Sequence, residues 1–214
     1  MAAAWDLVRE HGLAGLSMRD LGDRVGMRAQ SVYSYFASKH EIYDAMFLEG
    51  YQAFAGRMDE AVDGDRLVSE PVATAKGVAR AFVEFCTSDP ARYQLLFLRT
   101  IPGFEPSAAS YAVSERSYER MAEELAIVGV RGQATLDIWT AMLTGLASQQ
   151  ISNDPGGDRW KQLVDPVVEM LLGEAGTRAE TDTDTDTDTD TDTDTDNHGV
   201  TEPDSANPNE SEQP

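Results

Sequence analysis

The chain has 214 residues and is 41% hydrophobic, so it is long enough and apolar enough to bury a core of its own. Its formal net charge of −21 is unevenly distributed, because residues 181–214 hold 12 of the 38 acidic residues and no Lys or Arg. A single cysteine excludes an internal disulfide, and the lack of a signal-peptide pattern or of an apolar run of about 20 residues predicts a cytoplasmic protein with no membrane partner.

The first two predicted helices have clear start and stop signals. Residues 2–11 show helical apolar spacing and are followed by a glycine. Ser17 and Asp20 then match a capping box, in which Ser17 caps a helix over 18–25 and Asp20 reaches back. Gly26 can adopt the left-handed conformation that ends this helix.

The next two predicted helices differ in length. A short helix is expected over 28–36. Ser38 and Glu41 form a second capping box, which opens a long helix to about Val62 with apolar side chains at helical spacing. Short helices followed by a long one predict a compact three-helix head.

The remainder of the chain continues as amphipathic helices, and no segment has the pattern of a strand. The helices are expected at about 71–87, 90–98, 106–128, 133–152 and 158–172. Pro166 should kink the last of them or move its start to Asp165. The sequence therefore predicts an all-α protein.

From Thr181 to Asp196 the chain repeats Thr-Asp eight times. A segment with like charges and no apolar side chains cannot offset the entropy of ordering, so we expect disorder. A solvated tail is favoured over a calcium-binding or protein-binding repeat. The chain thus divides into a three-helix head over 1–47, a helical body over 48–174, and a disordered acidic tail over 175–214.

The helices over 18–25 and 28–36 are joined by a turn with Gly26 and bracketed by the two caps, which is the pattern of a DNA-binding helix-turn-helix. If Val32 faces the core, Gln30 and Ser34 point away from it. This polar face can enter a major groove, where Gln30 can pair with adenine and Arg28 with guanine.

Residues at the edges of the motif can hold phosphate. The helix starts capped by Ser17 and Ser38 present backbone N–H groups that suit phosphate oxygens. Lys39 adds a positive charge and Tyr35 a hydroxyl donor. Within residues 17–40 basic side chains outnumber acidic ones, although the chain as a whole is acidic.

The runs Leu16–Leu21, Val25–Met27 and Ser31–Lys39 resemble the head of the TetR family of bacterial transcription regulators. The most specific part is Tyr-x-Tyr-Phe-x-Ser-Lys, and the similarity is strong over residues 1–50. The resemblance implies a homodimer that binds a palindromic double-stranded DNA operator and releases it when a small-molecule effector binds the body. Repression, rather than activation, rests on this resemblance alone.

The resemblance and the groove geometry together give the candidate DNA-binding residues. They are Ser17, Arg28, Ala29, Gln30, Ser31, Tyr33, Ser34, Tyr35 and Lys39. Arg28 and Ala29 replace residues that are more common in the family, so the operator sequence of relatives does not transfer. The first helix begins at Ala2, where relatives usually have several more residues, often basic.

Aromatic and methionine side chains recur on the inner faces of the predicted body helices. Since small-molecule sites are mainly apolar, we expect some of them to line a pocket for an apolar or aromatic effector, the alternative being simple core packing. The candidate pocket residues are Phe82, Phe85, Tyr93, Phe97, Tyr118, Met121, Trp139 and Met142.

The last two predicted helices have wide apolar stripes, which the resemblance assigns to a four-helix dimer interface. The candidate interface residues are Leu146, Trp160, Leu163, Val164, Val167, Val168 and Leu171.

Other classes of protein are disfavoured. His11, His40 and His198 have no neighbouring carboxylate or cysteine pattern that suggests a triad or a metal site, so we expect neither an enzyme nor a cofactor. Cys86 is expected to be a buried thiol. A helical protein-interaction scaffold without specific DNA binding remains the alternative, although no repeat of 30–45 residues is visible.

Overall fold

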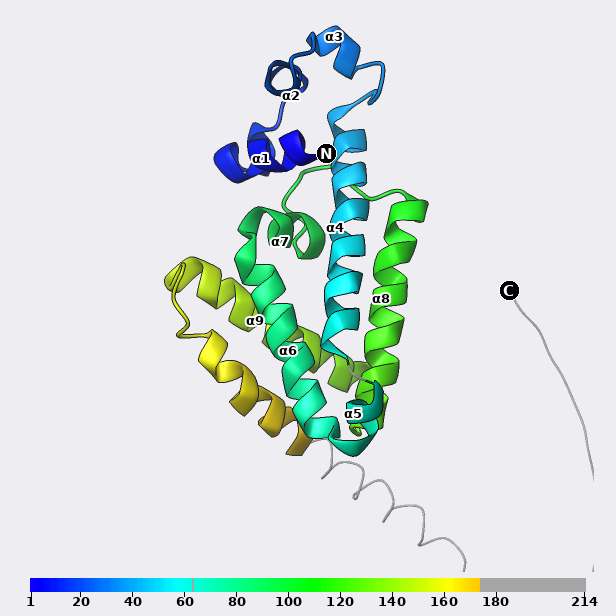
Figure 1. Ribbon diagram of the computed structural model, residues 1–214, viewed down its shortest axis with the longest axis vertical. Coiled ribbons are helices and arrows are strands. Elements are labelled where there is room, and N and C mark those ends of the chain that lie inside the picture. Colours follow the sequence, from blue (N-terminus) through cyan, green and yellow to red (C-terminus); the bar gives the residue numbers. More distant parts are fainter. Residues whose placement is uncertain (63, 174–214) are drawn as a thin grey trace, which may run out of the picture.

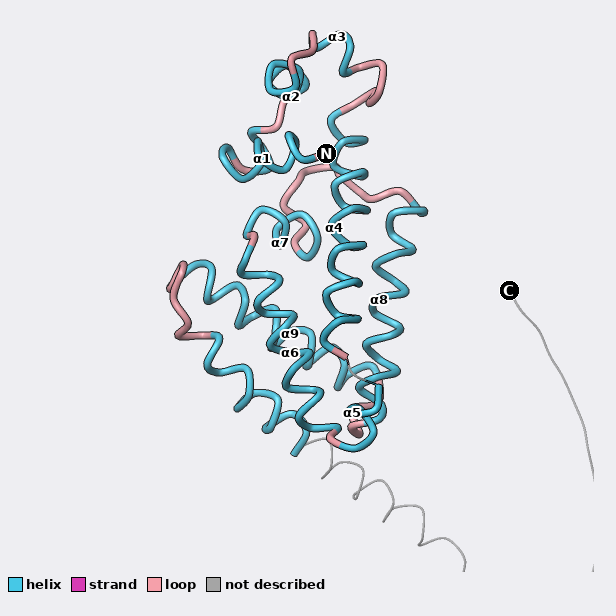
Figure 2. Tube along the Cα trace, in the orientation of Figure 1, coloured by secondary structure: helices cyan, strands magenta, loops and turns pink. Residues whose placement is uncertain are grey.

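The computed structural model describes residues 1–62 and 64–173, and within them every regular element is a helix. Figure 2 shows the helices joined by short loops. This confirms the prediction of an all-α protein. The predicted disordered tail over 175–214 lies outside the described residues.

Three short helices form the head, at the upper end of the molecule in Figure 1. They are α1 (Ala2–His11), α2 (Met18–Val25) and α3 (Ala29–Val32), with a 3₁₀ turn at Leu13–Gly15. The long helix α4 (Lys39–Ala61) begins in the head and runs down through the body beside α8. It is therefore the one continuous helix that the two parts share within the described residues.

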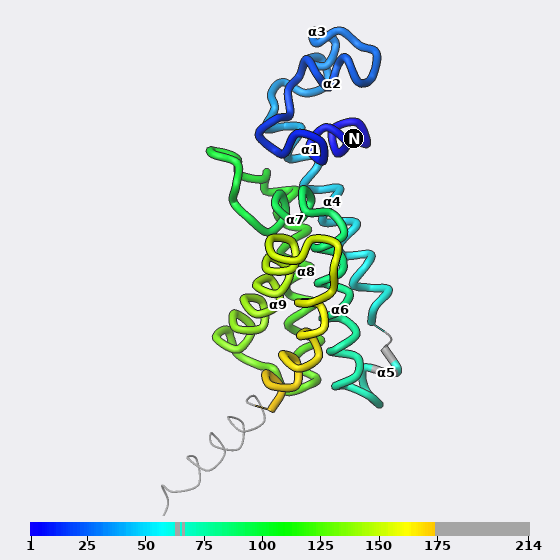
Figure 3. Tube along the Cα trace, turned by 90° about the vertical axis from the view of Figure 1, so that its left-hand side faces the viewer, coloured from blue at the N-terminus to red at the C-terminus, as the bar shows by residue number. Residues whose placement is uncertain are grey.

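The body surrounds the lower part of α4, as Figures 1 and 3 show. Its helices are α5 (Gly64–Ser69), α6 (Pro71–Ser88), α7 (Pro90–Phe97), α8 (Ala108–Ile127) and α9 (Gln133–Asn153). A 3₁₀ turn at Lys161–Leu163 leads into a final helical stretch over residues 164–173, which lies along α6 and α9.

The head has its own hydrophobic core, to which α1, α2 and the start of α4 contribute most. Val32 is the one buried side chain that α3 supplies to it, at 4% exposure. Leu95 of α7 also belongs to this core, so the head is packed directly on the body.

The body has two further cores. An aromatic cluster between α4, α6 and α7 is built around Phe47, Tyr51 and Phe85. A second cluster joins α6, α9 and residues 164–173, with Trp139 and Leu143 in its centre.

Two helix boundaries and one additional helix differ from the sequence predictions. The helix expected over 28–36 ends at Val32, because i→i+3 bonds such as Tyr35 N to Val32 O (3.0 Å) tighten the chain into turns before α4. Helix α8 starts after Ser107, whose hydroxyl accepts a bond from the Ser110 N–H. Helix α5 was not predicted at all.

The C-terminal helix also starts later than predicted. Residues 158–163 form a turn and a 3₁₀ segment, and the α-helical stretch begins at Val164. Pro166 is its third residue, where a backbone N–H has no partner within the helix in any case. The proline therefore moves the helix start to a position close to the predicted Asp165.

Candidate functional site: DNA-binding surface and effector cavity

The cap and the turn of the helix-turn-helix are formed largely as predicted. Ser17 Oγ accepts a bond from the Asp20 N–H (3.1 Å), and Gly26 has φ 70° and ψ 27°, in the left-handed region. The Asp20 carboxylate accepts from the Ser17 hydroxyl (2.5 Å) rather than from the Ser17 backbone N–H. Met27 N then donates to Gly22 O (2.8 Å), which closes the turn between α2 and α3.

Gly22 sets the distance between α2 and α3, and the sequence analysis missed it. A Cβ at this position would lie 2.7 Å from Met27 O and 3.2 Å from Ala29 N, closer than such atoms approach. Only a glycine lets the backbone of the turn pack against α2 here. Its position four residues before Gly26 was the available signal.

The segment from Arg28 to Tyr35, the reading segment, has one side buried in the head core and the other side exposed to solvent. Val32 is buried in the head core, whereas Gln30, Tyr33 and Tyr35 are exposed, Tyr35 by 72%. Figure 1 shows α3 and the loop after it at the far end of the molecule from the body. All the candidates between Arg28 and Tyr35 therefore lie on this distal surface.

Besides Ser17, two of the candidate DNA-binding residues use their side chains in bonds within the head. Lys39 Nζ donates to Ala14 O (2.9 Å) and lies 5.4 Å from the ring centre of Tyr43. Ser34 Oγ donates to Ser31 O (2.6 Å). Lys39 therefore fixes the start of α4 to the loop before α2.

The second capping box is formed in a shifted version. Ser38 Oγ accepts from the Glu41 N–H (3.3 Å), as predicted. The Glu41 carboxylate reaches back to the N–H of Ala37 (2.7 Å) instead of that of Ser38. The end of the loop that leads into α4 is thus fixed by two side-chain bonds.

The positive charge of the head is partly neutralised. Arg24 donates two bonds to Glu10, at 3.0 and 2.5 Å, and this guanidinium lowers the pKa of the Glu10 carboxyl. Arg19 lies 3.9 Å from Asp23. Arg28 has no ion-pair partner among the described residues, so its charge remains available at the reading surface.

A carboxylate at the start of α7 connects the head with the body. Asp89 Oδ2 accepts two bonds from Arg9 of α1, at 3.0 and 2.8 Å, while Oδ1 caps α7 through the Arg92 N–H (3.1 Å). Trp5 adds a bond from its indole to Glu49 of α4 (2.8 Å). The orientation of α1 is therefore tied to that of α7.

The body contains an interior cavity of about 340 Å³ between α4, α6, α8 and α9. Five of the predicted pocket residues line it: Phe82, Phe97, Tyr118, Met121 and Trp139. Sequence reasoning missed Tyr51 and Phe54, which α4 contributes to the same wall.

The other three predicted pocket residues lie elsewhere. Phe85 and Tyr93 are buried in the aromatic core cluster, and Met142 packs against the core between α6 and α9. The apolar pattern alone could not separate them from the cavity wall, since core and cavity residues occupy the same helix faces.

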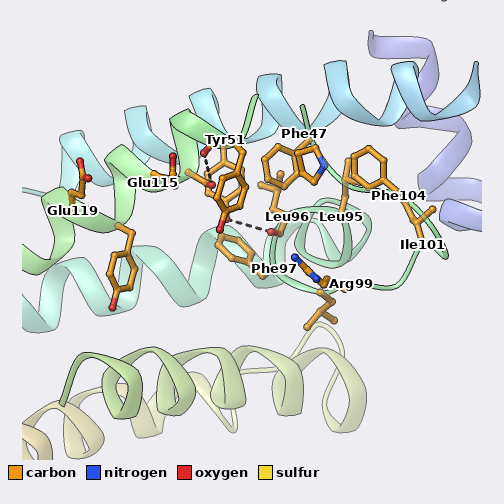
Figure 4. Close-up of a pocket in the computed structure, with 15 residues that line it drawn as sticks. Phe47, Tyr51, Leu95, Leu96, Phe97, Arg99, Ile101, Phe104, Glu115 and Glu119 are labelled. Atoms are coloured by element: carbon orange, nitrogen blue, oxygen red, sulfur yellow. Dashed lines mark hydrogen bonds between the residues drawn. The ribbon is translucent and has the colours of Figure 1, made fainter. Parts of the chain in front are cut away.

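A second, open cleft of about 620 Å³ lies directly below the head, bounded by α4, α7, α8 and the segment over 98–107. Figure 4 shows Phe47, Tyr51 and Phe97 along it, with Phe104 at the end nearest the head and Glu115 and Glu119 at the other end. The cleft and the interior cavity share four lining residues: Tyr51, Phe97, Ser114 and Tyr118. They are therefore adjoining spaces.

Two buried groups next to these spaces hold their protons. Burial raises the pKa of the Cys86 thiol to about 12, which agrees with the predicted buried cysteine. Burial also raises the pKa of the Tyr51 phenol, whose hydroxyl donates to Leu96 O at 3.3 Å. Cys86 is therefore a neutral core residue, and Tyr51 is a neutral part of the wall.

The predicted dimer-interface residues divide into two groups. Leu146, Val164, Val168 and Leu171 are buried in the core of the single chain, while Trp160 and Val167 are half-buried and Leu163 is 40% exposed. The outward apolar face of α9, the 3₁₀ turn and the final helix includes one predicted residue, Leu163. Its other members were not predicted: Ile138, Ala141, Gly145, Pro166 and Met170.

Two further properties were tested on the described part of the chain. No helix in residues 1–62 and 64–173 is long and apolar enough to cross a membrane. The same residues contain no group of three or more His, Cys, Asp or Glu side chains that could hold a metal ion.

Comparison with known proteins gives consistent matches. Residues 1–46 match the family described as "Bacterial regulatory proteins, tetR family". The HTH-type transcriptional regulator Rv1816 of Mycobacterium tuberculosis is 28% identical over 192 residues, covering 81% of this chain and 79% of the relative.

Solved structures share the fold at lower identity. PfmR, a TetR family transcriptional regulator from Thermus thermophilus, aligns with a TM-score of 0.61 and 19% identity over 80% of this chain and 95% of its own. AibR, in complex with isovaleryl coenzyme A and operator DNA, aligns with a TM-score of 0.60 and 16% identity over 79% and 94%.

Proposed function

We propose that this chain, a DNA-binding transcriptional regulator of the TetR family, is a cytoplasmic, homodimeric repressor that releases a palindromic operator when a small molecule binds its body. The observation that carries the proposal is the reading segment. It is fixed by one buried side chain, Val32, and exposes Gln30, Tyr33 and Tyr35 at the tip of the molecule.

The reading surface suits a major groove. Arg28 and Gln30 sit at the start of the segment, where a guanidinium can bind guanine and an amide can bind adenine. Tyr33, Tyr35 and the N-terminus of α2 at Ser17 surround it with donors for phosphate oxygens. Lys39 acts mainly by fixing the start of α4, since its ammonium group already donates to Ala14.

The partner in the dimer is a second copy of the chain. Helix α9 exposes Ile138, Ala141 and Gly145 at spacings of three and four residues, which is one helix face. The final helix adds Leu163 and Met170, which are 40% and 49% exposed. Packing this face on its own copy forms a four-helix interface and places two heads about 34–36 Å apart, the spacing of successive major grooves.

The effector site is the interior cavity with its adjoining cleft. Its mainly apolar and aromatic walls suit a small apolar molecule. An occupant would contact α4 through Tyr51 and α7 through Phe97, and both helices pack on the head. A ligand that prefers the arrangement with mismatched heads shifts the population away from the DNA-binding form.

Selection of genomic fragments by the purified protein, followed by footprinting, tests the DNA-binding part. We expect a protected palindrome that spans two successive major grooves. Gln30→Ala should change which base is preferred at one position in each half-site, at a cost of about 1–3 kcal/mol there. Protection of a single groove, or a monomeric mass by light scattering at micromolar concentration, contradicts the proposal.

A further inference from the structure

The cleft below the head is lined by exposed acidic side chains of α8. Helix α8 presents Tyr111, Glu115, Tyr118 and Glu119 to the cleft at spacings of four, three and one residues, so they share one helix face. Neither glutamate has an ion-pair partner among the described residues.

Aromatic rings line the same cleft. Tyr51 and Phe97 line the cleft from α4 and α7, with their ring centres 5.7 Å apart and tilted by 60°. In Figure 4 the two glutamates lie at one end of the cleft and Arg99 at the opposite end, with Tyr51 and Phe97 between them. Aromatic faces next to carboxylates are the surroundings in which an organic cation is stabilised.

The charged side chains of the adjoining cavity do not reverse the preference for a cation. Of the two arginines that line the cavity, Arg120 is bound by Asp59 and by Glu124, the latter at 2.9 Å. Arg116 is exposed at the cavity rim. Four carboxylates and three guanidinium groups line the two spaces together, so the lining has a net negative charge.

We propose that the two adjoining spaces form one effector site for an elongated organic cation, with its ammonium group in the cleft beside Glu115 and Glu119 and its apolar or aromatic end in the interior cavity. The residues shared by both spaces, among them Tyr51 and Tyr118, form the passage between the two ends of the ligand. This inference rests on the proposed function and names the chemical class of its effector.

Phe104 connects the cleft with the head. Its ring lines the cleft and meets Tyr43 edge-on at 5.7 Å and His40 at 5.9 Å, both in the first turns of α4. The end of its loop is fixed to α4, because Asp44 accepts a bond from the Ser107 N–H (2.7 Å). Phe104 therefore joins the end of the cleft nearest the head to the start of α4, next to the reading segment.

A charge-matched series of probes tests the proposal by calorimetry. The probes are phenylbutyl trimethylammonium, the neutral isostere in which carbon replaces the quaternary nitrogen, the sulfonate of the same length, and tetramethylammonium. We expect the phenylbutyl ammonium to bind about tenfold more tightly than the neutral isostere. Tetramethylammonium should bind about a hundredfold more weakly, because it leaves the interior cavity unused.

Variants locate the binding. The double variant Glu115→Gln with Glu119→Gln should lower the affinity for the ammonium probe to that for the neutral isostere. Glu123→Gln removes an exposed charge from the same helix outside both spaces and should change nothing. Equal affinity for the ammonium and the neutral probe, tighter binding of the sulfonate, or no binding of any probe overturns the cationic class.

The same samples separate this inference from the proposed function. Operator binding is measured without a probe, and release is measured with the ammonium probe present. Release of the operator by the ammonium probe, lost in the double glutamine variant, supports the inference. A protein that binds its operator selectively but shows no preference for the cation overturns the inference and leaves the function standing. A protein without selective DNA binding overturns the function whatever the probes do.

Discussion

The head and the body of this protein use their side chains differently. The head closes a core around one continuous run of sequence, Ala4 to Met46, with a single side chain, Leu95, added from the body. The body leaves a cavity of about 340 Å³ and a cleft of about 620 Å³ between helices that are far apart in sequence. A rigid reader of DNA and a chamber for a ligand have opposite packing requirements, and one chain meets both by separating them along α4.

Gly22 is the glycine of the head that lies closest against backbone atoms, so the largest effect is expected there. Gly22→Ala places a Cβ 2.7 Å from Met27 O, a backbone atom that cannot move without opening the turn between α2 and α3. We expect a loss of roughly 2–4 kcal/mol in the free energy of unfolding, together with loss of specific DNA binding. Chemical denaturation and a DNA mobility shift measure the two effects.

Gly56 supplies the matched control in the body half of α4. A Cβ there meets nothing within 4 Å, so Gly56→Ala should stabilise the protein by about 0.5–1 kcal/mol through helix propensity alone. Equal stability of the two variants would mean that the close approach at Gly22 is not a constraint.

The second largest effect on stability is expected at the connection between head and body. Asp89→Ala removes both the cap of α7 and the ion pair with Arg9, and should cost about 2 kcal/mol. Asp89→Asn keeps a capping oxygen and loses the ionic partner, so it should cost about half as much. Thermal unfolding of these variants and of Arg9→Gln measures the pair.

A double-mutant cycle isolates the ion pair from the cap. Arg9 and Asp89 should show a coupling of about 1 kcal/mol, because the Asp89 side chain is only 9% exposed while that of Arg9 is half exposed. If Asp89→Asn and Arg9→Gln simply add, the carboxylate only caps α7 and the head is held by apolar packing.

Two tyrosines of α4 allow the same substitution in each region. The Tyr43 hydroxyl donates to Leu13 O inside the head, and the Tyr51 hydroxyl donates to Leu96 O at 3.3 Å beside the cavity. Tyr43→Phe should cost about 1–1.5 kcal/mol and Tyr51→Phe about 0.5 kcal/mol, because the bond of Tyr51 is long and lies next to open space. The denaturant midpoints of the two variants measure these losses in stability. A larger loss for Tyr51→Phe would contradict the difference in packing between the head and the body.

The same difference explains what the sequence could predict. Ser17, Gly26 and Ser38 are local signals, since a cap or a left-handed glycine depends on its neighbours in the chain. Helices α1 and α2 and the start of α4 accordingly lie at the predicted residues. The end of α3 at Val32 was missed because the turns after it depend on where α4 must begin.

In the body, packing between helices that are far apart in sequence determines which side chains are buried and which line the cavity. The sequence predicted this only in part. Phe82 and Phe85 lie on the same helix and have the same chemistry, yet Phe82 lines the cavity and Phe85 is part of the core. The outward face of the C-terminal helices was misplaced for the same reason. Val164 and Val168 look like interface residues on an apolar stripe, but α6 and α9 already cover them.

The smallest effect concerns the C-terminal helix, which an ion pair joins to α6 at the surface. The Arg80 guanidinium hydrogen-bonds the Asp165 carboxylate (2.6 Å) and lowers the pKa of that carboxyl. Since the folded pKa is depressed, the stabilisation is fully present above the unfolded value of about 3.9 and is lost as the pH falls through the folded value. Both side chains are substantially exposed, so screening limits the contribution to about 0.5 kcal/mol. Asp165→Asn should therefore be slightly less stable than wild type at pH 7, and the difference should disappear as the pH falls through the depressed folded pKa of Asp165. An unchanged difference at low pH would mean that residue 165 acts through the start of the helix and not through its charge.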